Sequence, residues 1–342
     1  MLPRSRIISV VLIGLGAALI AASALAPLFM HTDGRVAVDG EETTLSLRDP
    51  HATLRSIAHP EEGATKTRVL RQLHTTVEEP SDADGAQLRV GVSVTREGEH
   101  SEDPQDLGGL HTAQVWSFGI DRRDGRVAGD MRVIEQIASP TRTIPGEGWW
   151  FAFPPNPEER TYDLFDDTLR GFYPADFVEN TTLEGRDVKH YRQHIEPQNV
   201  ARHYAGPLNT TRLPDGSEGY LYHSARRDLW VDEDSGVLLR LSEGIDDYYG
   251  RADGSRAEDV FTFQGEMSEG DIQARVDEAT RLGGRSVADI ILLVCVILGA
   301  ILLLAGMVGA LWPGRGPRRR RRAEDAGSED GHAAAADGTP VA

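Results

Sequence analysis

Two histidines four residues apart, His190 and His194, come nearest in this sequence to a metal-binding pair. On a helix this spacing would place the side chains about 6 Å apart on one face. The surrounding residues, 188–195, follow a glycine and favour a strand, in which the same spacing gives about 13 Å, too far for one metal ion. We therefore expect two surface histidines on a sheet, and we predict no metal site.

Motifs for nucleophilic or phosphate chemistry are missing as well. The chain contains no G-x-S-x-G, no G-x-x-x-x-G-K and no H-E-x-x-H sequence. Its single cysteine, Cys295, lies within a long apolar segment, which excludes an intramolecular disulfide and a Cys-His zinc site. We assign no catalytic residue and no cofactor, and we expect a non-catalytic protein. Because carboxylates are abundant, an accessory enzyme of envelope glycan assembly is the alternative.

An aromatic run, WWFAFPP at 149–155, is the densest apolar stretch between the two longest hydrophobic segments of the chain. It predicts a buried core strand. Exposed aromatic side chains are costly unless they are used, so the alternative is a groove for acyl chains or a partner. The residues that we expect to line such a groove are Trp149, Trp150, Phe151 and Trp230.

The two longest hydrophobic segments, 7–30 and 290–312, carry no charge and exceed the roughly 20 residues needed to cross a hydrocarbon core as a helix. Arg4 and Arg6 precede the first segment, and an arginine run at 318–322 follows the second. The positive-inside rule therefore predicts a two-pass plasma-membrane protein with both termini in the cytoplasm. A cleaved signal peptide is the alternative for the first segment, but its length favours an uncleaved anchor.

This topology predicts the organisation of the whole chain. We expect a cytoplasmic N-terminus at residues 1–6, a first transmembrane helix at 7–30 and an extracytoplasmic β-rich domain at 31–286. A second transmembrane helix at 287–312 and an arginine-rich, disordered cytoplasmic tail at 313–342 follow. Small residues spaced by four in both spans predict that the two helices pack closely: Gly14, Ala18 and Ala22 in the first, and Ala305, Gly306, Gly309 and Ala310 in the second.

The predicted external domain is strongly acidic. Residues 31–286 hold 48 acidic and 28 basic residues, a net charge of −20, and Lys66 and Lys189 are the only lysines of the chain. At molar salt the screening length falls to about 3 Å, which removes most of the repulsion between carboxylates that would oppose folding. This composition therefore predicts a halophilic protein whose melting temperature falls when the salt is diluted. It also argues against nucleic-acid binding, which depends on phosphate neutralisation. N-glycosylation candidates are Asn180 and Asn209.

One pattern of short strands recurs three times in this domain. A strand with aromatic residues leads into an acidic turn that ends in glycine, and a second strand follows, at 115–127, 161–173 and 229–239. Such turns close bulged hairpins, with the glycine in the left-handed conformation; calcium loops are the alternative interpretation. Successive hairpins predict one large curved antiparallel sheet. The fold class is therefore a membrane-anchored α+β protein, mainly antiparallel β and half-barrel-like, between N- and C-terminal transmembrane helices.

A helix is predicted between this sheet and the second span. Ser268 and Asp271 form an N-terminal cap, and an apolar stripe at Ile272, Val276, Ala279 and Leu282 is suited to packing on the sheet. The glycine pair at 283–284 is expected to end this helix and to act as a hinge.

The chain resembles the PorA-like family, a domain of unknown function in two-span membrane proteins of actinobacteria and haloarchaea. The resemblance covers residues 1–312 and rests on DRRDG at 121–125, on GWWFAFP at 148–154, and on LWVD at 229–232 with Gly236. Where family members often have Phe-Pro-Phe, this chain has Phe153-Pro154-Pro155. The repeated turns are also similar to those of periplasmic lipoprotein-carrier domains, whose half-barrels hold acyl chains.

Together these features predict an envelope protein whose external β domain binds or scaffolds a lipid, a lipid-linked glycan or an envelope protein. The lipid bilayer is the first expected partner, and a homo-oligomer is a further candidate. The porin label of the family leaves an oligomeric channel as a third hypothesis. The domain is too charged for a membrane β-barrel, and the spans lack a polar stripe to line a pore.

Overall fold

The computed structural model describes residues 4–26, 36, 42–57, 59–97, 109–135 and 141–311, and for residues 4–6 and 283–289 it describes the backbone alone. The arginine run and the C-terminal tail lie outside these residues. The chain divides into two compact units. Of the described residues, those up to 22 and from 295 onward form one unit, and those between 23 and 294, which include the sheet, form the other.

The first unit consists of two packed helices. Helix α1 (Arg4–Leu25) and the C-terminal part of helix α2 (Glu269–Leu311) contain apolar spans, at Ile7–Leu25 and Ile290–Leu311, that are long enough to cross a membrane. The helices are antiparallel, since Gly16 lies against Gly299 whereas Ser9 lies against Gly306.

The packing of these helices brings their backbones into contact. A Cβ on Gly16 would lie 2.6 Å from the carbonyl oxygen of Gly299, and one on Gly306 would lie 2.9 Å from that of Ser9. The prediction that Gly14 lies in the contact between the helices is wrong, because nothing lies within 4 Å of a Cβ placed there. The contact follows a seven-residue period through Ser9 and Gly16, which is the period of two helices that wrap around each other.

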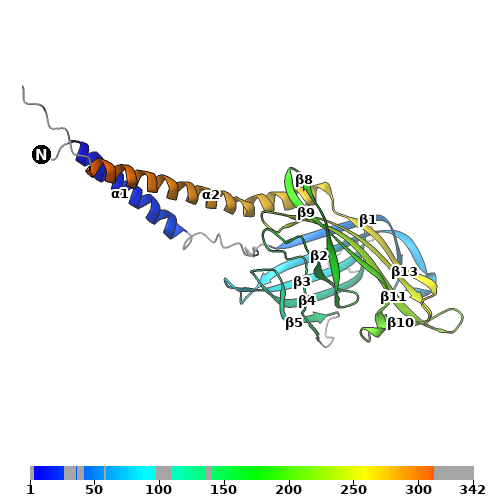
Figure 1. Ribbon diagram of the computed structural model, residues 1–342. Coiled ribbons are helices and arrows are strands. Elements are labelled where there is room, and N and C mark those ends of the chain that lie inside the picture. Colours follow the sequence, from blue (N-terminus) through cyan, green and yellow to red (C-terminus); the bar gives the residue numbers. More distant parts are fainter. Residues whose placement is uncertain are drawn as a thin grey trace, which may run out of the picture. The chain divides into compact units, whose positions relative to one another are not determined.

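The second unit is built on a 13-stranded sheet in which every pair of neighbouring strands is antiparallel (Figure 1). The strand order is β6-β5-β4-β3-β2-β1-β13-β12-β11-β9-β8-β7, with β10 beside β11. The strands are β1 (Thr43–Arg55), β2 (Ala64–Glu78), β3 (Gly85–Arg96), β4 (Leu110–Asp121), β5 (Val127–Ile134), β6 (Arg142–Pro145), β7 (Tyr162–Asp166), β8 (Gly171–Leu183), β9 (Arg186–Asn199), β10 (Thr210–Arg212), β11 (Glu218–Asp232), β12 (Leu238–Gly250) and β13 (Arg256–Glu266). The predicted antiparallel β domain between terminal helices is therefore confirmed.

The sheet is not closed, yet its two ends come together at one short segment. Gly148 O accepts a hydrogen bond from Val127 N at 2.8 Å, at the start of β5. The next residue, Trp149, exchanges two backbone hydrogen bonds with β7, to Asp163 O at 2.9 Å and from Phe165 N at 2.8 Å. Residues 148–149 thus connect β5 to β7 and hold the curvature of the sheet.

The three predicted hairpins are present as β4–β5, β7–β8 and β11–β12. Gly125 and Gly236 close the first and third turns with φ of 77° and 74°, as expected. In the second turn the prediction was wrong by one residue, because Arg170, not Gly171, has the positive φ, 56°. Arg170 is buried and lies over the ring of Tyr204, so side-chain packing favours a conformation that a residue with a Cβ seldom adopts.

Helix α2 begins as predicted and ends later. The hydroxyl of Ser268 accepts from Asp271 N at 3.1 Å, and Ile272, Val276 and Ala279 are buried in the core of the β domain. The predicted end at the glycine pair 283–284 is wrong, because the helix continues to Leu311. A glycine inside a helix costs about 1 kcal/mol relative to alanine, which the neighbouring helix-forming residues can offset.

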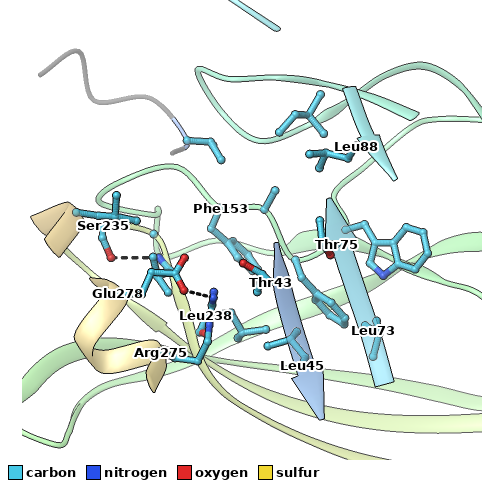
Figure 2. A pocket seen from close by; sticks show the side chains of 18 of the residues that line it. Thr43, Leu45, Leu73, Thr75, Leu88, Phe153, Ser235, Leu238, Arg275 and Glu278 are labelled. Atoms are coloured by element: carbon cyan, nitrogen blue, oxygen red, sulfur yellow. Dashed lines mark hydrogen bonds and ion pairs between the residues drawn. The ribbon is translucent and has the colours of Figure 1, made fainter. Parts of the chain in front are cut away.

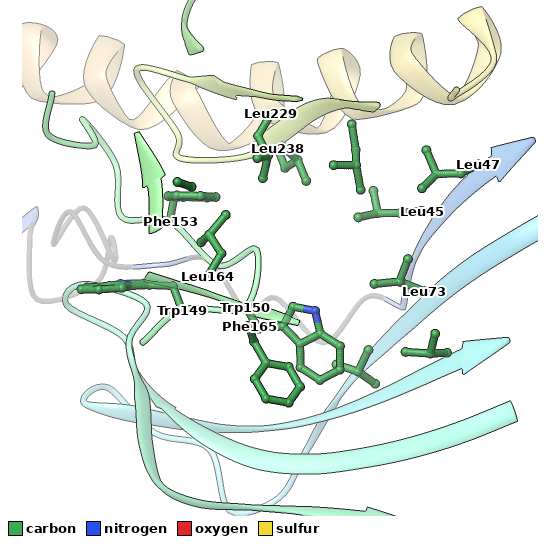
Figure 3. Close-up of a cluster of buried hydrophobic side chains, with 14 of the residues drawn as sticks. Leu45, Leu47, Leu73, Trp149, Trp150, Phe153, Leu164, Phe165, Leu229 and Leu238 are labelled. Atoms are coloured by element: carbon green, nitrogen blue, oxygen red, sulfur yellow. The ribbon is translucent and has the colours of Figure 1, made fainter. Parts of the chain in front are cut away.

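The core of the β domain collects apolar side chains from distant parts of the chain. Figure 3 shows leucines of β1, β2, β7, β11 and β12 around Trp149, Trp150 and Phe153. Phe118 stacks on Trp150 with ring centroids 5.4 Å apart, and Trp116 meets Trp150 edge to face at 5.6 Å. Aromatic pairs of this geometry add to the free energy gained by burial.

Candidate functional site

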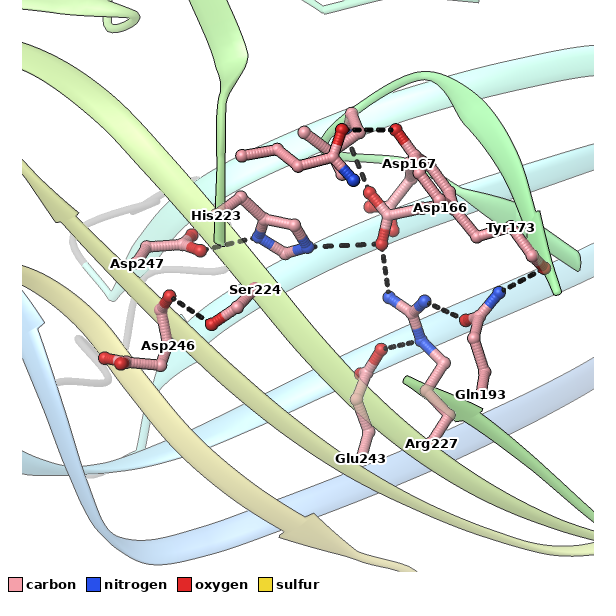
Figure 4. Close-up of polar contacts among 12 residues, drawn as sticks. Asp166, Asp167, Tyr173, Gln193, His223, Ser224, Arg227, Glu243, Asp246 and Asp247 are labelled. Atoms are coloured by element: carbon pink, nitrogen blue, oxygen red, sulfur yellow. Dashed lines mark hydrogen bonds and ion pairs between the residues drawn. The ribbon is translucent and has the colours of Figure 1, made fainter. Parts of the chain in front are cut away.

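The interior of the β domain contains a cluster of charged side chains centred on Arg227 of β11 (Figure 4). Its guanidinium donates to Glu243 Oε1 at 2.6 Å, to Gln193 Oε1 at 2.6 Å and to Asp166 Oδ2 at 2.8 Å. Arg227 and Glu243 are each 2% exposed, and Asp166 is fully buried. The charged groups of this cluster are therefore paired with one another rather than with water.

Arg71 of β2 extends the cluster across the interior of the sheet. Its guanidinium donates to Glu243 Oε2 at 2.7 Å and to Asp167 Oδ1 at 2.8 Å. Burial alone would lower the pKa of Arg71, but the charges of Asp167 and Glu243 raise it above its usual value. In the same way, the charges of nearby carboxylates outweigh the effect of burial and raise the pKa of Arg227. Strand β2 is thereby fixed to β12 and to the turn after β7.

His223 of β11 completes the cluster between two aspartates. Its Nδ1 lies 2.6 Å from Asp247 Oδ1, and its Nε2 lies 3.2 Å from Asp166 Oδ2. Burial disfavours the charged ring, but the two carboxylates outweigh it and raise the pKa of His223 to about 10. The pKa of Asp166 is held below its usual range by His223 and Arg227 against the effect of burial, whereas burial raises the pKa of Asp247.

The cluster is suited to structure rather than to catalysis. Its carboxylates contact arginine or histidine and do not line the cavity described below. Within the described ranges, no group of three or more His, Cys, Asp or Glu residues is placed to bind a metal ion. A pair of carboxylates facing a deep pocket would have favoured an enzyme; here paired carboxylates are sealed inside the sheet.

A cavity inside the β domain has a volume of about 300 Å³ (Figure 2). It lies between strands β1–β4 on one side and the aromatic segment, the β11–β12 turn and helix α2 on the other. Its apolar lining consists of Val36, Leu45, Leu73, Val77, Leu88, Val90, Ile120, Trp150, Phe151, Ala152, Phe153, Val237, Leu238 and Leu282. A mainly apolar concave space of this size is typical of sites for small hydrophobic ligands.

Two glycine turns hold the aromatic segment against this cavity. A Cβ on Gly125 would collide with the carbonyl oxygen of Ala152, and one on Gly236 would collide with those of Phe153 and Pro154. Phe151, directly before these contacts in the chain, has a φ of 54°, which is uncommon for a residue with a bulky side chain. The turns of the first and third hairpins thus fix the conformation of the segment that forms one wall.

Of the four residues expected to line a groove, two line the cavity and two lie elsewhere. Trp150 and Phe151 line the cavity, whereas Trp149 and Trp230 do not. Trp149 is 6% exposed and donates from Nε1 to Asp124 O at 2.8 Å. Trp230 lies on the other face of the sheet, where its ring stacks on His190 at 4.7 Å and Arg240 lies over it.

His190 and His194 differ in exposure, which their spacing in the sequence did not predict. The predicted strand is confirmed as β9. His194 is exposed as expected, but the prediction of a surface position is wrong for His190, which is 5% exposed. Its Nε2 lies 2.8 Å from Asp228 Oδ1, and the stacked Trp230 ring covers it.

Charged residues of helix α2 were missed as cavity residues. Arg275, Glu278 and Arg281 line the cavity beside Leu282. In the sequence, Arg275 and Glu278 look like an ordinary surface pair at i, i+3 beside the apolar stripe. A usable signal was their position next to that stripe, which places them at the edge of the surface that packs on the sheet.

The two glycosylation candidates also have different surroundings. Asn180 is exposed on β8, and its Nδ2 donates to Glu159 Oε1 at 2.8 Å. Asn209 is 4% exposed, and its Nδ2 donates to the backbone oxygen of Tyr204 at 2.8 Å. A glycan on Asn209 would have to displace this contact, so of the two residues only Asn180 stays a candidate.

Fold and cavity together define a membrane protein with an open antiparallel sheet, two apolar terminal helices and an internal apolar cavity. A family model described as Porin PorA matches residues 8–308, and the chain belongs to this family. The Porin PorA of Corynebacterium amycolatum is 25% identical over 247 residues, which are 61% of this chain and 61% of that protein. The chain therefore matches less than two thirds of the length of that relative.

Proposed function

We propose that this protein is a non-catalytic, membrane-anchored envelope protein whose extracytoplasmic β domain binds the apolar chain of a lipid or a lipid-linked glycan. The observation that carries the proposal is the cavity of about 300 Å³, walled by leucine, valine and aromatic side chains. Transfer of a hydrocarbon chain from water into such a space contributes about 0.8 kcal/mol for each buried methylene group. The cavity, not the charged cluster, is thus the functional site of this proposal.

The position of the cavity along the chain supports a lipid as the ligand. Leu282 lines the cavity, and the second apolar span begins at Ile290, eight residues later. Even a fully extended chain of this length covers no more than about 28 Å. This short connection between the cavity and the span supports a ligand that is taken up from the bilayer.

The orientation of the protein is part of the same proposal. Antiparallel packing of α1 and α2 supports a two-pass topology with both termini on one side of the membrane. Arginine-rich flanks favour the cytoplasm for that side, which leaves the β domain outside the cell. Envelope proteins or a second copy of the chain are further candidate partners there.

The family description favours a channel as the second candidate function. A pore built from the two spans would need several copies and a polar lining, yet both spans lack charged residues. Conductance of the purified protein in planar bilayers tests this hypothesis. Steps of current that require the protein would favour the channel, and their absence at high protein density would leave the binding role.

Lipid analysis of the purified protein tests the proposed function. Full-length protein is prepared in molar salt from its native membranes, and the bound lipids are extracted and identified by mass spectrometry. A different two-span membrane protein, prepared in the same way, is the reference for lipids of the surrounding bilayer. We expect one lipid class to be enriched at near-stoichiometric amounts.

A pair of threonine variants on β2 provides the matched control. Thr75 lines the cavity, whereas the next residue, Thr76, does not, because successive side chains of a strand point to opposite faces. Thr75→Phe should fill the cavity and abolish the enrichment, and Thr76→Phe should preserve it. Equal enrichment in both variants, or a lipid profile that matches the reference protein, would refute a lipid site in this cavity.

A further inference from the structure

The lining of the cavity is apolar along most of its wall and charged at one place. Arg275, Glu278 and Arg281 of helix α2 contribute the charged side chains, and Ser235 of the β11–β12 turn also lines the cavity. Figure 2 shows Ser235, Arg275 and Glu278 on the same side of the cavity. The opposite wall, formed by β1, β2 and β3, contributes leucine, valine and threonine. A ligand that fills this space meets hydrocarbon on one side and charge on the other.

Arg275 is held in place by two contacts. Its Nε donates to the backbone oxygen of Leu238 at 3.0 Å, and its Nη1 forms an ion pair with Glu278. The side chain of Arg275 is 13% exposed, whereas that of Glu278 is 27% exposed. The guanidinium is therefore largely removed from water and has one partly solvated carboxylate beside it.

The two arginines of the charged cluster differ from Arg275 in the number of their carboxylate partners. Arg71 contacts both Asp167 and Glu243, and Arg227 contacts both Asp166 and Glu243. Their pKa values are raised, whereas burial lowers the pKa of Arg275 despite the opposing charge of Glu278. One more anion beside Arg275 would give it the surroundings that the other two arginines already have.

We propose that the cavity binds a single-chain amphiphile with an anionic head group, and that Arg275 binds that head group. This inference rests on the proposed function and specifies the ligand. A carboxylate or a phosphate monoester can accept charge-assisted hydrogen bonds from the guanidinium N–H groups that Leu238 and Glu278 do not use. The volume of about 300 Å³ is at the lower end of the range for ligand pockets and suits one hydrocarbon chain rather than several.

Calorimetric titration of full-length protein in amphipol with four probes tests the ligand class. The probes are dodecanoate, dodecyl phosphate, dodecanol and inorganic phosphate. We expect at least one of the two anionic amphiphiles to bind roughly tenfold more tightly than dodecanol, which has the same chain without the charge. Inorganic phosphate, which has the charge without the chain, should not bind. A preference between the two anionic probes distinguishes a fatty acid from a phosphate-bearing lipid.

Variants of Arg275 test the residue. Arg275→Gln should weaken binding of the preferred anionic probe by roughly tenfold and leave binding of dodecanol unchanged, and Arg275→Lys should give a smaller loss. Arg240→Gln is the control, because Arg240 is paired with Glu266 on the surface and does not line the cavity.

The possible failures of the two proposals are distinguishable. Equal affinity of the unmodified protein for dodecanol and for both anionic probes would overturn the head-group inference and leave the lipid site intact. Failure of all three dodecyl probes to bind would overturn the proposed function itself. Because both outcomes are read from the unmodified protein, they do not depend on whether the Arg275 variants fold.

Discussion

Buried arginines occur in two different settings inside the same β domain. Arg71 and Arg227 each contact two carboxylates that are almost fully buried, so these charges join strands from opposite parts of the sheet. Arg275 contacts one partly exposed carboxylate and borders an apolar cavity. The comparison shows that burial of a charge does not by itself indicate a functional site. The number of opposite charges around it and the presence of adjacent space separate a structural arginine from a candidate binding residue.

The largest effect is expected from breaking the charged cluster at Glu243, which contacts both Arg71 and Arg227. Glu243→Gln should lower the free energy of unfolding of the β domain by about 3–5 kcal/mol, because two buried guanidinium groups lose their shared carboxylate. Urea unfolding followed by tryptophan fluorescence measures this loss. Glu266→Gln, which removes an exposed partner of Arg240, should cost about 0–1 kcal/mol. Equal losses in the two variants would contradict a structural role for the cluster.

A substitution at Gly236, which holds the aromatic wall of the cavity, should lower the free energy of unfolding by nearly as much. Gly236→Ala forces a residue with a Cβ into a φ of 74° and pushes that Cβ into the carbonyl oxygens of Phe153 and Pro154. We expect a loss of about 2–5 kcal/mol in the free energy of unfolding. Gly216→Ala separates the two causes, since φ there is 82° and nothing lies within 4 Å of the added Cβ. That control should cost about 1–2 kcal/mol; a Gly236 variant no worse than this would show that the segment is not clamped.

Alkaline pH should lower the free energy of unfolding, because His223 in the charged cluster loses its proton. The pKa of His223 is raised to about 10 in the folded protein by Asp166 and Asp247, against about 6.5 in an unfolded chain. The stabilisation is therefore complete below about pH 6.5 and is lost as the pH rises through about 10, at up to about 1.4 kcal/mol per pH unit. Urea unfolding at pH 7 and pH 9 should differ by about 2–3 kcal/mol. Replacement of His223 by Gln should remove this slope, whereas replacement of the exposed His194 should preserve it.

How far the sequence predicts the molecule differs between the fold and the site. The hairpin turns and the helix stripe at 272–282 are local patterns, and they predict the antiparallel sheet and the helix that covers it. The charged cluster is not predictable in this way, because His223, Arg227 and Glu243 occupy inward-facing positions at which an alternating strand pattern expects apolar residues. Their partners become apparent only when the register of distant strands is known.

The cavity itself was predicted only in part. The aromatic run identifies Trp150 and Phe151, which line the cavity. Trp230 belongs to an equally suggestive motif but faces the other side of the sheet, because side chains alternate along a strand and the sequence does not say which face is covered. Arg275 was missed because the curvature of the sheet, not the helix pattern, creates the space next to it.

The smallest effect on stability is expected at Arg275. Arg275→Gln should change the free energy of unfolding by less than about 1 kcal/mol, because removal of an incompletely paired buried charge offsets the lost hydrogen bonds. Arg227→Gln should cost about 3–5 kcal/mol, since it leaves Asp166 and Glu243 without their shared cation. Similar losses at both positions would mean that Arg275 is a structural residue like the other two.

Photoaffinity labelling tests whether the apolar cavity of the β domain holds a lipid chain. Full-length protein in native-like membranes is exposed to a fatty acid that carries a diazirine on its chain, and the labelled peptides are mapped by mass spectrometry. We expect labels on cavity-lining segments, at 43–45, 73–77, 150–153 and 275–282, and their loss in Thr75→Phe but not in Thr76→Phe. Labels confined to the two apolar spans, with none on the β domain, would contradict this expectation.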